Sequence, residues 1–322
     1  MNPILVRVVV ASLGLGTTAA HAADIAYPTR PIRLVCPQAA GGAADMVSRL
    51  FAEKLAVELG QPVVVENKVG ASTMIGADFV AKSPPDGYTL LTASVTTLAI
   101  NPGLFAKMPY DPVKDFAPVS VMSNLPYYLV SAPDLPARNV QELIRYAKAH
   151  PGKVNYSSPG TGTSPQLIGA MFANLAGIDV VHVPYKGSSN AQVDMAAGRV
   201  QFAFESGALP GIKAGRVRAL GYTGAKRSEE MPDLPTVAEQ GLPGFEGSVW
   251  NGLVAPAGTP PEIVDKLAKA VIKVARMPEV KARLGEYSGI PVGNTPAEFA
   301  AQIEADIQKW GKIIRDNQIS IQ

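Results

Sequence analysis

The fold is decided by residues 32–66, which read IRLVCPQAAGGAADMVSRLFAEKLAVELGQPVVVE. This stretch begins with a short β-branched run at Ile32–Cys36 and passes through a glycine-rich turn into apolar residues that recur at helical spacing. Gly60 is placed to end that helix, and a second β-branched run begins at Val63. Strand, glycine-rich turn, helix and strand in this order predict one unit of an α/β sheet.

The same order of elements returns further along the chain. A turn at residues 157–164 follows a strand-like run, and Pro165 stands in the first turn of the helix that should follow. Two similar units predict two lobes, each an α/β sheet flanked by helices, and the continuously apolar strands predict parallel sheets. Beyond residue 66, strand-like runs occur at Tyr88–Thr92, Val119–Met122, Tyr128–Ser131, Val154–Ser157, Val180–Val183, Val200–Phe204, Val217–Gly221 and Gly252–Ala255.

The sequence contains no low-complexity linker, so ordered strands should join the two lobes. Asn124–Pro126 is one candidate crossing, and the run through Gly221–Gly224 is the second. Two crossings predict that one lobe is inserted into the other. The predicted division is a first lobe of residues 23–124 and 222–322 and a second lobe of residues 125–221.

Residues 1–22 have the pattern of a cleaved secretory signal peptide. A short basic start is followed by an apolar run at residues 8–17 and by Ala20-His21-Ala22, a small-x-small cleavage pattern. The apolar run is shorter than the roughly 18 residues that a membrane span needs. We therefore expect export and cleavage before Ala23.

The composition excludes several classes of function. Of the 322 residues, 47% are hydrophobic and 17% are charged, which is typical of a globular chain. The net charge of +2, with dispersed basic residues, does not provide the surface that nucleic-acid binding requires. A single cysteine, Cys36, and three histidines argue against disulfides and metal sites. We expect no nucleic-acid partner, no metal and no cofactor.

Common catalytic and nucleotide-binding motifs are missing from the sequence. Neither G-x-S-x-G nor G-x-x-x-x-G-K-[ST] occurs. His182 lies in an apolar run, which favours a hydrogen-bonded core histidine over a catalytic base. The alternative is an isomerase or lyase with Glu205 as its base, but the sequence offers no second convincing acid or base. The missing motifs therefore argue against acyl-transfer and nucleotide-dependent enzymes.

Two glycine- and hydroxyl-rich turns, at residues 38–45 and 157–164, are the candidate binding elements. Each opens a helix, and helix N-termini bind anions through unpaired N–H groups and a partial positive charge. For either turn alone, a tight turn with hydroxyl caps is the alternative. One turn in each lobe predicts a cleft for a small anion, with Asp45 holding its own loop and Ser94–Thr97 as a weaker third element. The candidate contacts are Gln38, Ala40, Gly41, Gly42, Ala43, Asp45, Ser94, Thr96, Ser158, Thr161, Gly162, Thr163 and Ser164.

Motifs spread over the chain resemble the Bug or TctC-type periplasmic solute receptors of tripartite tricarboxylate transporters. The resemblance covers essentially the whole chain after the signal peptide. Its motifs include Ala39–Gly42 with Asp45, Pro85–Leu90 (PDGYTL), His182–Gly187 (HVPYKG), Gly241–Phe245 (GLPGF) and Ala255–Pro260 (APAGTP).

The resemblance implies a two-lobed periplasmic binding protein of type II, joined by two crossing strands, that closes on a small organic anion. It adds Tyr185 of the HVPYKG motif to the candidate ligand contacts. Glu205 is a further candidate on its own pattern, because it ends an apolar strand of the second lobe; pairing with a nearby Lys or Arg is the alternative. The resemblance also implies a periplasmic location, delivery of the ligand to a membrane permease and no enzymatic activity. A receptor that signals to a membrane sensor would share every ligand contact and is the alternative. A monomer is the default, because a hinged cleft needs no second subunit.

Departures from the family pattern bear on the ligand. Gln38 stands where an aromatic residue is usual, so we expect a more polar ligand. Ser157 and Gln166 replace the expected glycine and histidine around the second turn. Glu205 replaces a common aspartate and could accept a hydrogen bond from an amine or hydroxyl of the ligand. The sequence leaves open whether the ligand is a di- or tricarboxylate, an amino acid, an aromatic acid or a neutral amide.

Overall fold

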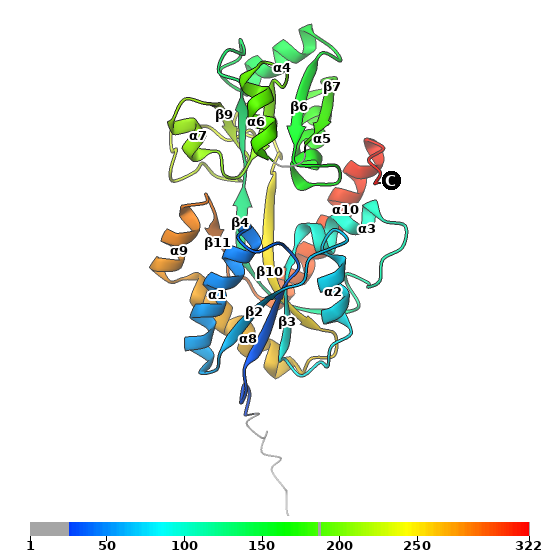
Figure 1. The fold of residues 1–322 in the computed structure, drawn as a ribbon, viewed down its shortest axis with the longest axis vertical. Coiled ribbons are helices and arrows are strands. Elements are labelled where there is room, and N and C mark those ends of the chain that lie inside the picture. Colours follow the sequence, from blue (N-terminus) through cyan, green and yellow to red (C-terminus); the bar gives the residue numbers. More distant parts are fainter. Residues whose placement is uncertain (1–25, 186–187, 322) are drawn as a thin grey trace, which may run out of the picture.

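The structure is a computed structural model that describes residues 26–185 and 188–321. The predicted signal peptide lies outside the described residues. Two sheets, each flanked by helices, form two lobes stacked along the long axis of the molecule (Figure 1). The expectation of a two-lobed α/β protein is confirmed.

The larger lobe contains a six-stranded sheet in the order β11-β4-β10-β3-β1-β2. Helices α1, α8 and α9 pack on one face of this sheet, and α2, η1 and α10 pack on the other. Its strands are β1 (Ile32–Cys36), β2 (Val63–Asn67), β3 (Thr89–Ser94), β4 (Phe116–Pro126), β10 (Ser248–Pro256) and β11 (Ile290–Pro291). Its helices are α1 (Ala43–Leu59), α2 (Met74–Ala81), the π-helical η1 (Thr96–Ile100), α3 (Asn101–Leu104), α8 (Pro261–Ala275), α9 (Pro278–Gly285) and α10 (Pro296–Asp316).

The smaller lobe contains a five-stranded sheet in the order β7-β6-β8-β5-β9. Its strands are β5 (Tyr128–Ser131), β6 (Val154–Ser158), β7 (Val180–Pro184), β8 (Phe202–Glu205) and β9 (Arg218–Tyr222). Its helices are α4 (Val140–Ala149), α5 (Ser164–Ala176), α6 (Ser188–Ala196) and α7 (Leu209–Lys213). Within the described ranges, no helix combines the length and apolarity that crossing a membrane requires.

The strand–turn–helix unit predicted from residues 32–66 is confirmed. β1 pairs in parallel with both β2 and β3. α1 ends at Gly60, whose φ of 70° lies in the left-handed region that glycine tolerates. Val47, Phe51 and Leu55 are fully buried. The apolar residues that recur at helical spacing in the sequence therefore form the stripe of α1 that faces the core.

The expectation of parallel sheets is wrong for the strands near the centre of the molecule. β10 pairs antiparallel with β3 and β4, and β5 pairs antiparallel with β8 and β9. The reason is topological, because β4 carries the chain toward the smaller lobe and β10 brings it back. Apolar content does not reveal this difference, since central strands are buried on both faces in either orientation.

Three chain segments meet between the lobes at Tyr127, Thr223 and Gly247. The Tyr127 N–H donates to Thr223 Oγ1 at 2.7 Å, and the Thr223 N–H donates to the Tyr127 carbonyl at 2.9 Å. The Thr223 hydroxyl in turn donates to the Gly247 carbonyl at 2.6 Å. These bonds hold both crossings together at one point between the lobes.

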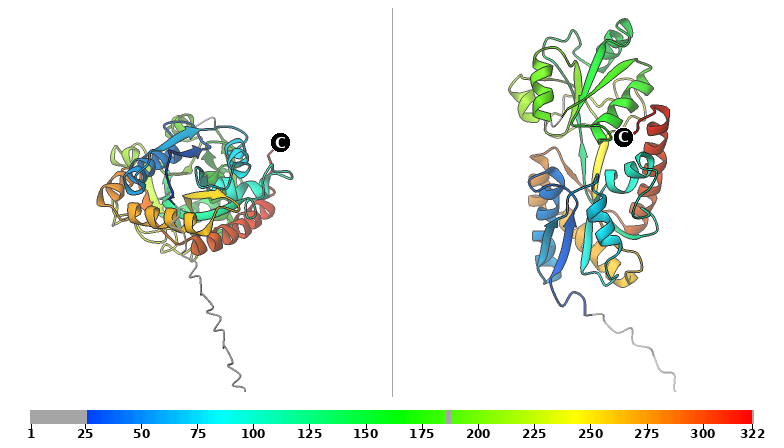
Figure 2. Two further views of the ribbon diagram at one scale, coloured as in Figure 1. Left: turned by 90° about the horizontal axis from the view of Figure 1, so that it is seen from below. Right: turned by 45° about the vertical axis from the view of Figure 1, so that its right-hand side comes forward.

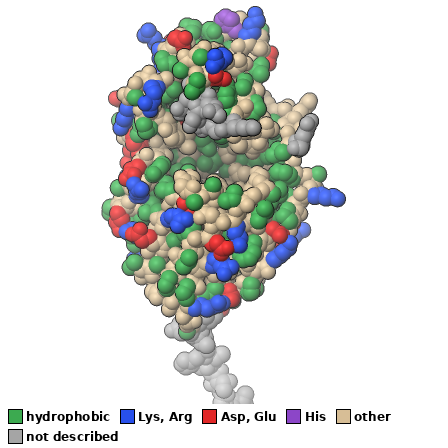
Figure 3. Space-filling model, in the orientation of Figure 1, with side chains coloured by type: hydrophobic (Ala, Val, Ile, Leu, Met, Phe, Trp, Pro, Cys, Tyr) green, Lys and Arg blue, Asp and Glu red, His purple; other side chains and the backbone are tan. Residues whose placement is uncertain are grey.

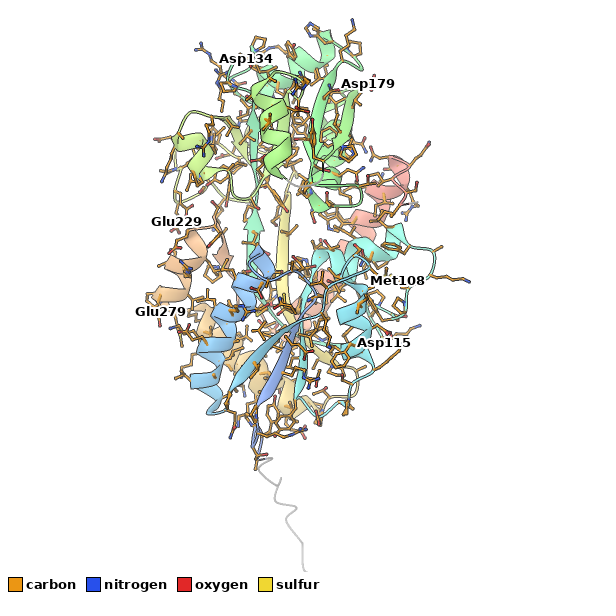
Figure 4. The ribbon with its side chains drawn as sticks, viewed as in Figure 1. Met108, Asp115, Asp134, Asp179, Glu229 and Glu279 are labelled. Atoms are coloured by element: carbon orange, nitrogen blue, oxygen red, sulfur yellow. The ribbon has the colours of Figure 1, made fainter. Side chains whose placement is uncertain are left out.

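The segment between β9 and β10 packs on the smaller lobe. Its Phe245 stacks on Phe204 of β8 with ring centroids 6.2 Å apart. Nearer its start, Glu229 lies next to α9 of the larger lobe (Figure 4) and accepts from Lys281 at 2.9 Å. The chain returns to the larger sheet at Ser248, where β10 begins.

Candidate ligand-binding cleft

A cavity of about 290 Å³ lies between the two lobes, and Figure 3 shows the surface hollowed at this level. Its walls include the N-terminal ends of α1, α2 and α5 and the start of β10. Thr96 Oγ1 of the larger lobe and Ser164 Oγ of the smaller lobe lie 3.5 Å apart. Both lobes therefore contribute to one site.

A second cavity of about 250 Å³ continues the first into the smaller lobe. The two cavities share Tyr127, Pro165 and Ser206, so they form one cleft. Ligand pockets are typically about 300–1,000 Å³, so the cleft has room for a small metabolite. Among the described residues that line it, Glu205 is the one with a charged side chain.

The structure brings most of the predicted contacts to this cleft, although they come from distant parts of the sequence. Ser158 and Glu205 line the second cavity. The first cavity is lined by the predicted residues Gln38, Ala43, Ser94, Thr96, Thr161, Gly162, Thr163 and Ser164.

Five predicted contacts do not line either cavity, and they are Ala40, Gly41, Gly42, Asp45 and Tyr185. The Gly41 N–H donates to Asp45 Oδ2 at 2.9 Å, and the Gly42 N–H donates to the Ala39 carbonyl at 3.2 Å. Both glycine amides are thus bonded within their own loop. Gly41 has a φ of 80°, so this residue shapes the turn.

The residues of the first loop that reach the cavity are the opening residues of α1. Ala43 and Ala44 are the first two helical residues after the N-cap Gly42, and both line the cavity. N–H groups at these positions have no partner within the helix. Ser164 occupies the equivalent place in α5, after the N-cap Thr163. Two helix N-termini, one from each lobe, therefore face the same cavity and make it suitable for an anion.

Asp45 holds the first loop, as the sequence predicted. Its carboxylate accepts from the Gly41 N–H, from Arg49 Nε at 2.9 Å and from Asn67 Nδ2 at 2.8 Å. Burial alone would raise the pKa of Asp45, but these hydrogen bonds outweigh it and lower the pKa to about 2. The carboxylate is therefore ionised at neutral pH, and its hydrogen bonds go to groups of its own lobe.

The second loop is held by neutral groups. The Gly162 N–H donates to Gln166 Oε1 at 2.6 Å. The hydroxyls of Ser158 and Thr163 both donate to the Gly160 carbonyl, at 2.8 and 2.6 Å. The Gly162 amide is thus committed to Gln166, and the hydroxyls and the α5 N-terminus supply the polar groups of this wall.

His182 is hydrogen-bonded, as expected, but it is half-buried on the edge strand β7 and does not lie in the core. Its Nε2 lies 2.7 Å from Ser158 Oγ. Burial lowers the pKa of His182 to about 4, so the ring is neutral at pH 7. Its contact with Ser158 fixes one side of the second loop.

Glu205 and Tyr185 have different surroundings. Glu205 ends β8 and also lines a third cavity of about 240 Å³ together with Arg216. The Tyr185 hydroxyl donates to Asp194 Oδ2 at 2.6 Å, and Asp194 pairs with Arg199. Across residues 26–185 and 188–321, no group of three or more His, Cys, Asp or Glu side chains is placed to hold a metal ion.

Sequence reasoning missed the turn before α2, which contributes Ser72 and Thr73 to the first cavity. Ala71, Ser72 and Thr73 all have positive φ, at 45°, 50° and 76°. Asn101 supports this turn by donating to the Ser72 carbonyl at 2.7 Å. Strained turns of non-glycine residues are often found at functional sites. The available signal was the position of these hydroxyl residues between a strand and a helix.

The residues around the crossing strands were also missed. Tyr127 and Ser206 line both cavities, and Trp250 and Asn251 of β10 line the first. Trp250 Nε1 donates to Asp306 Oδ2 in α10 at 2.7 Å, which fixes the indole. No local pattern marks these positions, because their place in the cleft follows from the antiparallel return of β10 between the lobes.

Comparison with known proteins agrees with this architecture. The structure resembles the solved structure of R. palustris Rpa4515 with adipate, with 36% identity, a TM-score of 0.79, and coverage of 92% of this chain and 100% of the other. It also resembles MatC from Rhodopseudomonas palustris with bound malate, with 32% identity, a TM-score of 0.74, and coverage of 89% and 100%.

Sequence comparison gives the family. The chain is 36% identical to protein BugT of Bordetella pertussis over 304 residues, which cover 94% of this chain and 93% of that protein. The pattern of the tripartite tricarboxylate transporter family receptors, TctC, matches residues 47–319. The chain belongs to the TctC family of tripartite tricarboxylate transporter receptors.

Proposed function

We propose that this protein is a periplasmic solute-binding receptor that captures a small organic carboxylate between its lobes and delivers it to a membrane permease. The observation that carries the proposal is the convergence of the α1 and α5 N-termini, one from each lobe, on one hydroxyl-rich cavity. N–H groups and helix dipoles stabilise a carboxylate without a cationic side chain.

The relatives support a carboxylate ligand. Rpa4515 has adipate in its structure, and MatC has malate. Both are small organic acids that a cleft of this size would admit. Gln38 and the hydroxyls of Ser94 and Thr96 give the cavity polar groups for further hydrogen bonds to the ligand.

Capture follows from closure of the two lobes. A ligand that contacts Ala43 on one lobe and Ser164 on the other stabilises the arrangement in which both are within reach. The hydrogen bonds around Thr223 provide the pivot. We propose that the lobes divide near residues 124 and 247, because residues 223–247 pack mainly on the smaller lobe. The division predicted from the sequence instead placed residues 222–247 in the larger lobe.

The proposal includes export by the N-terminal signal peptide, release of the ligand unchanged and action as a monomer. An isomerase or lyase would use Glu205 as its base and would convert the bound acid. A receptor for a membrane sensor would bind the same acid and differ only in its partner. Incubation with the bound acid, followed by mass spectrometry of the small molecules, separates a receptor from an enzyme.

The test is a thermal-shift screen of the purified protein against malate, adipate, other di- and tricarboxylates, amino acids and neutral amides. A ligand present at about 100 times its Kd adds about 2.7 kcal/mol to the free energy of unfolding. We expect a clear rise in melting temperature with at least one carboxylate. A rise only with neutral amides, or with no member of the panel, would contradict the proposal.

A further inference from the structure

The residues that follow α10 reach from the larger lobe to the turn at residues 157–164 of the smaller lobe. Figure 2 shows α10 along the side of the larger lobe, with its last turn beside the smaller lobe. α10 packs closely on α3 of the larger lobe. Ile314 lies so near Gly103 that a methyl group at position 103 would come within 2.7 Å of Ile314 Cδ1. The chain that follows α10 therefore starts from a fixed position.

A tight turn directs the chain after α10. Gln318 has a φ of 51°, its N–H donates to the Arg315 carbonyl at 3.1 Å, and the Ile319 N–H donates to the Ile314 carbonyl at 3.0 Å. These are the two bonds of a Schellman motif, which ends a helix with a left-handed residue. The turn leads the tail, residues Gln318–Ile321, away from the helix axis.

Ile321 of the tail lies against Gly162, which lines the first cavity. A Cβ built on Gly162 would lie 2.5 Å from Ile321 Cδ1 and 3.1 Å from Leu104 Cδ1. Gly162 has a φ of 77°, and its N–H is bonded to Gln166. Two apolar side chains of the larger lobe therefore occupy the space that any other side chain at position 162 would need.

We propose that the tail is a positioning element of the ligand site. Ile321 supports the turn at residues 161–163, so that Thr161, Thr163 and Ser164 keep their places on the cavity wall. It also makes the conformation of this loop depend on the larger lobe. The proposal rests on the proposed function, because it assumes that this turn contacts the ligand. Since linked equilibria are reciprocal, ligand binding must in turn restrict the tail.

The first experiment compares Ile321→Ala with Ile307→Ala. Ile307 is a partly buried isoleucine of α10 that packs on the core and does not line the cleft, so its variant controls for lost apolar contact. Binding of malate and adipate is measured by calorimetry. We expect Ile321→Ala to weaken binding about tenfold by loosening a preorganised loop, and Ile307→Ala to leave the Kd unchanged. Equal Kd values for both variants would overturn the proposal.

Hydrogen exchange gives a readout that needs no ligand. In Ile321→Ala, the peptide covering residues 158–166 should exchange faster than in the wild type, whereas Ile307→Ala should leave it unchanged. Unchanged exchange in Ile321→Ala would overturn the positioning role even if no tested acid bound. Failure of the wild type to bind any carboxylate would instead contradict the proposed function.

A double variant tests whether the contact itself is responsible. Gly162→Ala alone places a methyl group against Ile321 and Leu104 at a left-handed φ and should weaken binding. Combining Gly162→Ala with Ile321→Ala removes the closer of the two contacts, so the double variant should bind more tightly than the sum of the single effects predicts, although the strain of alanine at this φ remains. Strictly additive effects would show that the two residues act independently and would overturn the proposal.

Discussion

The turns before α1 and α5 share one order of elements but are fixed by different chemistry. The first is held by a buried carboxylate, Asp45, which binds the Gly41 amide and pairs with Arg49 of the same helix. The second has no charged support among its described contacts and is held by Gln166 and by Ile321 from the other lobe. A glycine-rich turn in the sequence therefore does not reveal how the turn is held.

The two turns depend on different parts of the molecule. The first turn is self-contained, so it should respond to changes of charge within α1. The second turn relies on neutral hydrogen bonds and on a contact between lobes, so it should respond to burial, to protonation of His182 and to the tail. The two turns can thus be perturbed one at a time.

The largest expected effect is on ligand affinity, from Ala43→Asp. A carboxylate at the first position of α1 suits the helix dipole but stands on the cavity wall beside the bound anion. We expect binding of malate or adipate to weaken about 100-fold, which corresponds to about 2.7 kcal/mol. Calorimetry measures the loss. Ala43→Asn, of nearly the same size but neutral, should lose much less, and an equal loss would show that charge is not the cause.

The next effect is on stability, from Asp45→Asn. The substitution removes the charge-assisted bond to Arg49, so the free energy of unfolding should fall by about 1–3 kcal/mol. Urea unfolding checks the value. Glu58→Gln, which breaks the exposed pair with Lys273 near the other end of α1, should cost less than about 1 kcal/mol. If both variants lose the same amount, the first turn is not specially held by Asp45.

Acidification should affect the two turns in separate pH windows. The pKa of His182 lies at about 4, below its usual value of about 6.5, so the unfolded chain binds more protons between these values. His182 therefore contributes stability that is present above pH 6.5 and is lost as the pH falls toward 4. Asp45, with a pKa of about 2, loses its contribution only below about pH 3.9.

Melting temperatures between pH 7 and pH 4.5 test the contribution of His182. The wild type should become less stable over this range, and His182→Gln, which can still hydrogen-bond Ser158, should show a shallower slope. An unchanged slope would contradict the assignment to His182.

The smallest expected effect is spectroscopic. Both tryptophans are buried, but Trp250 of β10 lines the first cavity and Trp310 of α10 does not. A bound ligand should therefore change the emission of Trp250. Titration with the bound acid should alter the fluorescence of the wild type, and Trp250→Phe should abolish the change. A signal that persists in Trp250→Phe would mean that the ligand does not occupy this cavity.

Much of the fold could be predicted because local patterns specify it. The stripe of Val47, Phe51 and Leu55, followed by Gly60, predicts α1, and the structure confirms it. The antiparallel return of β10 could not be predicted, because buried central strands are apolar in either direction.

The site was predicted where it depends on local order and missed where it depends on long-range contact. Ser158 ends β6 and Ser164 opens α5, so a local strand–turn–helix pattern marks both. Trp250 reaches the cavity only because β10 passes between the lobes, and Ile321 meets Gly162 across a large separation in sequence. The Gly41 N–H is bonded to Asp45 because the loop folds back on that carboxylate. The amino-acid sequence of the loop does not reveal this bond.

A crystal structure of the protein with malate or adipate bound tests the central claim most directly. We expect one carboxylate of the ligand to lie within about 3 Å of the N–H groups that open α1, at Ala43 or Ala44, and of the Ser164 end of α5. Both lobes would then contact a single ligand. A carboxylate held by Arg216, or a ligand that touches one lobe alone, would contradict the account.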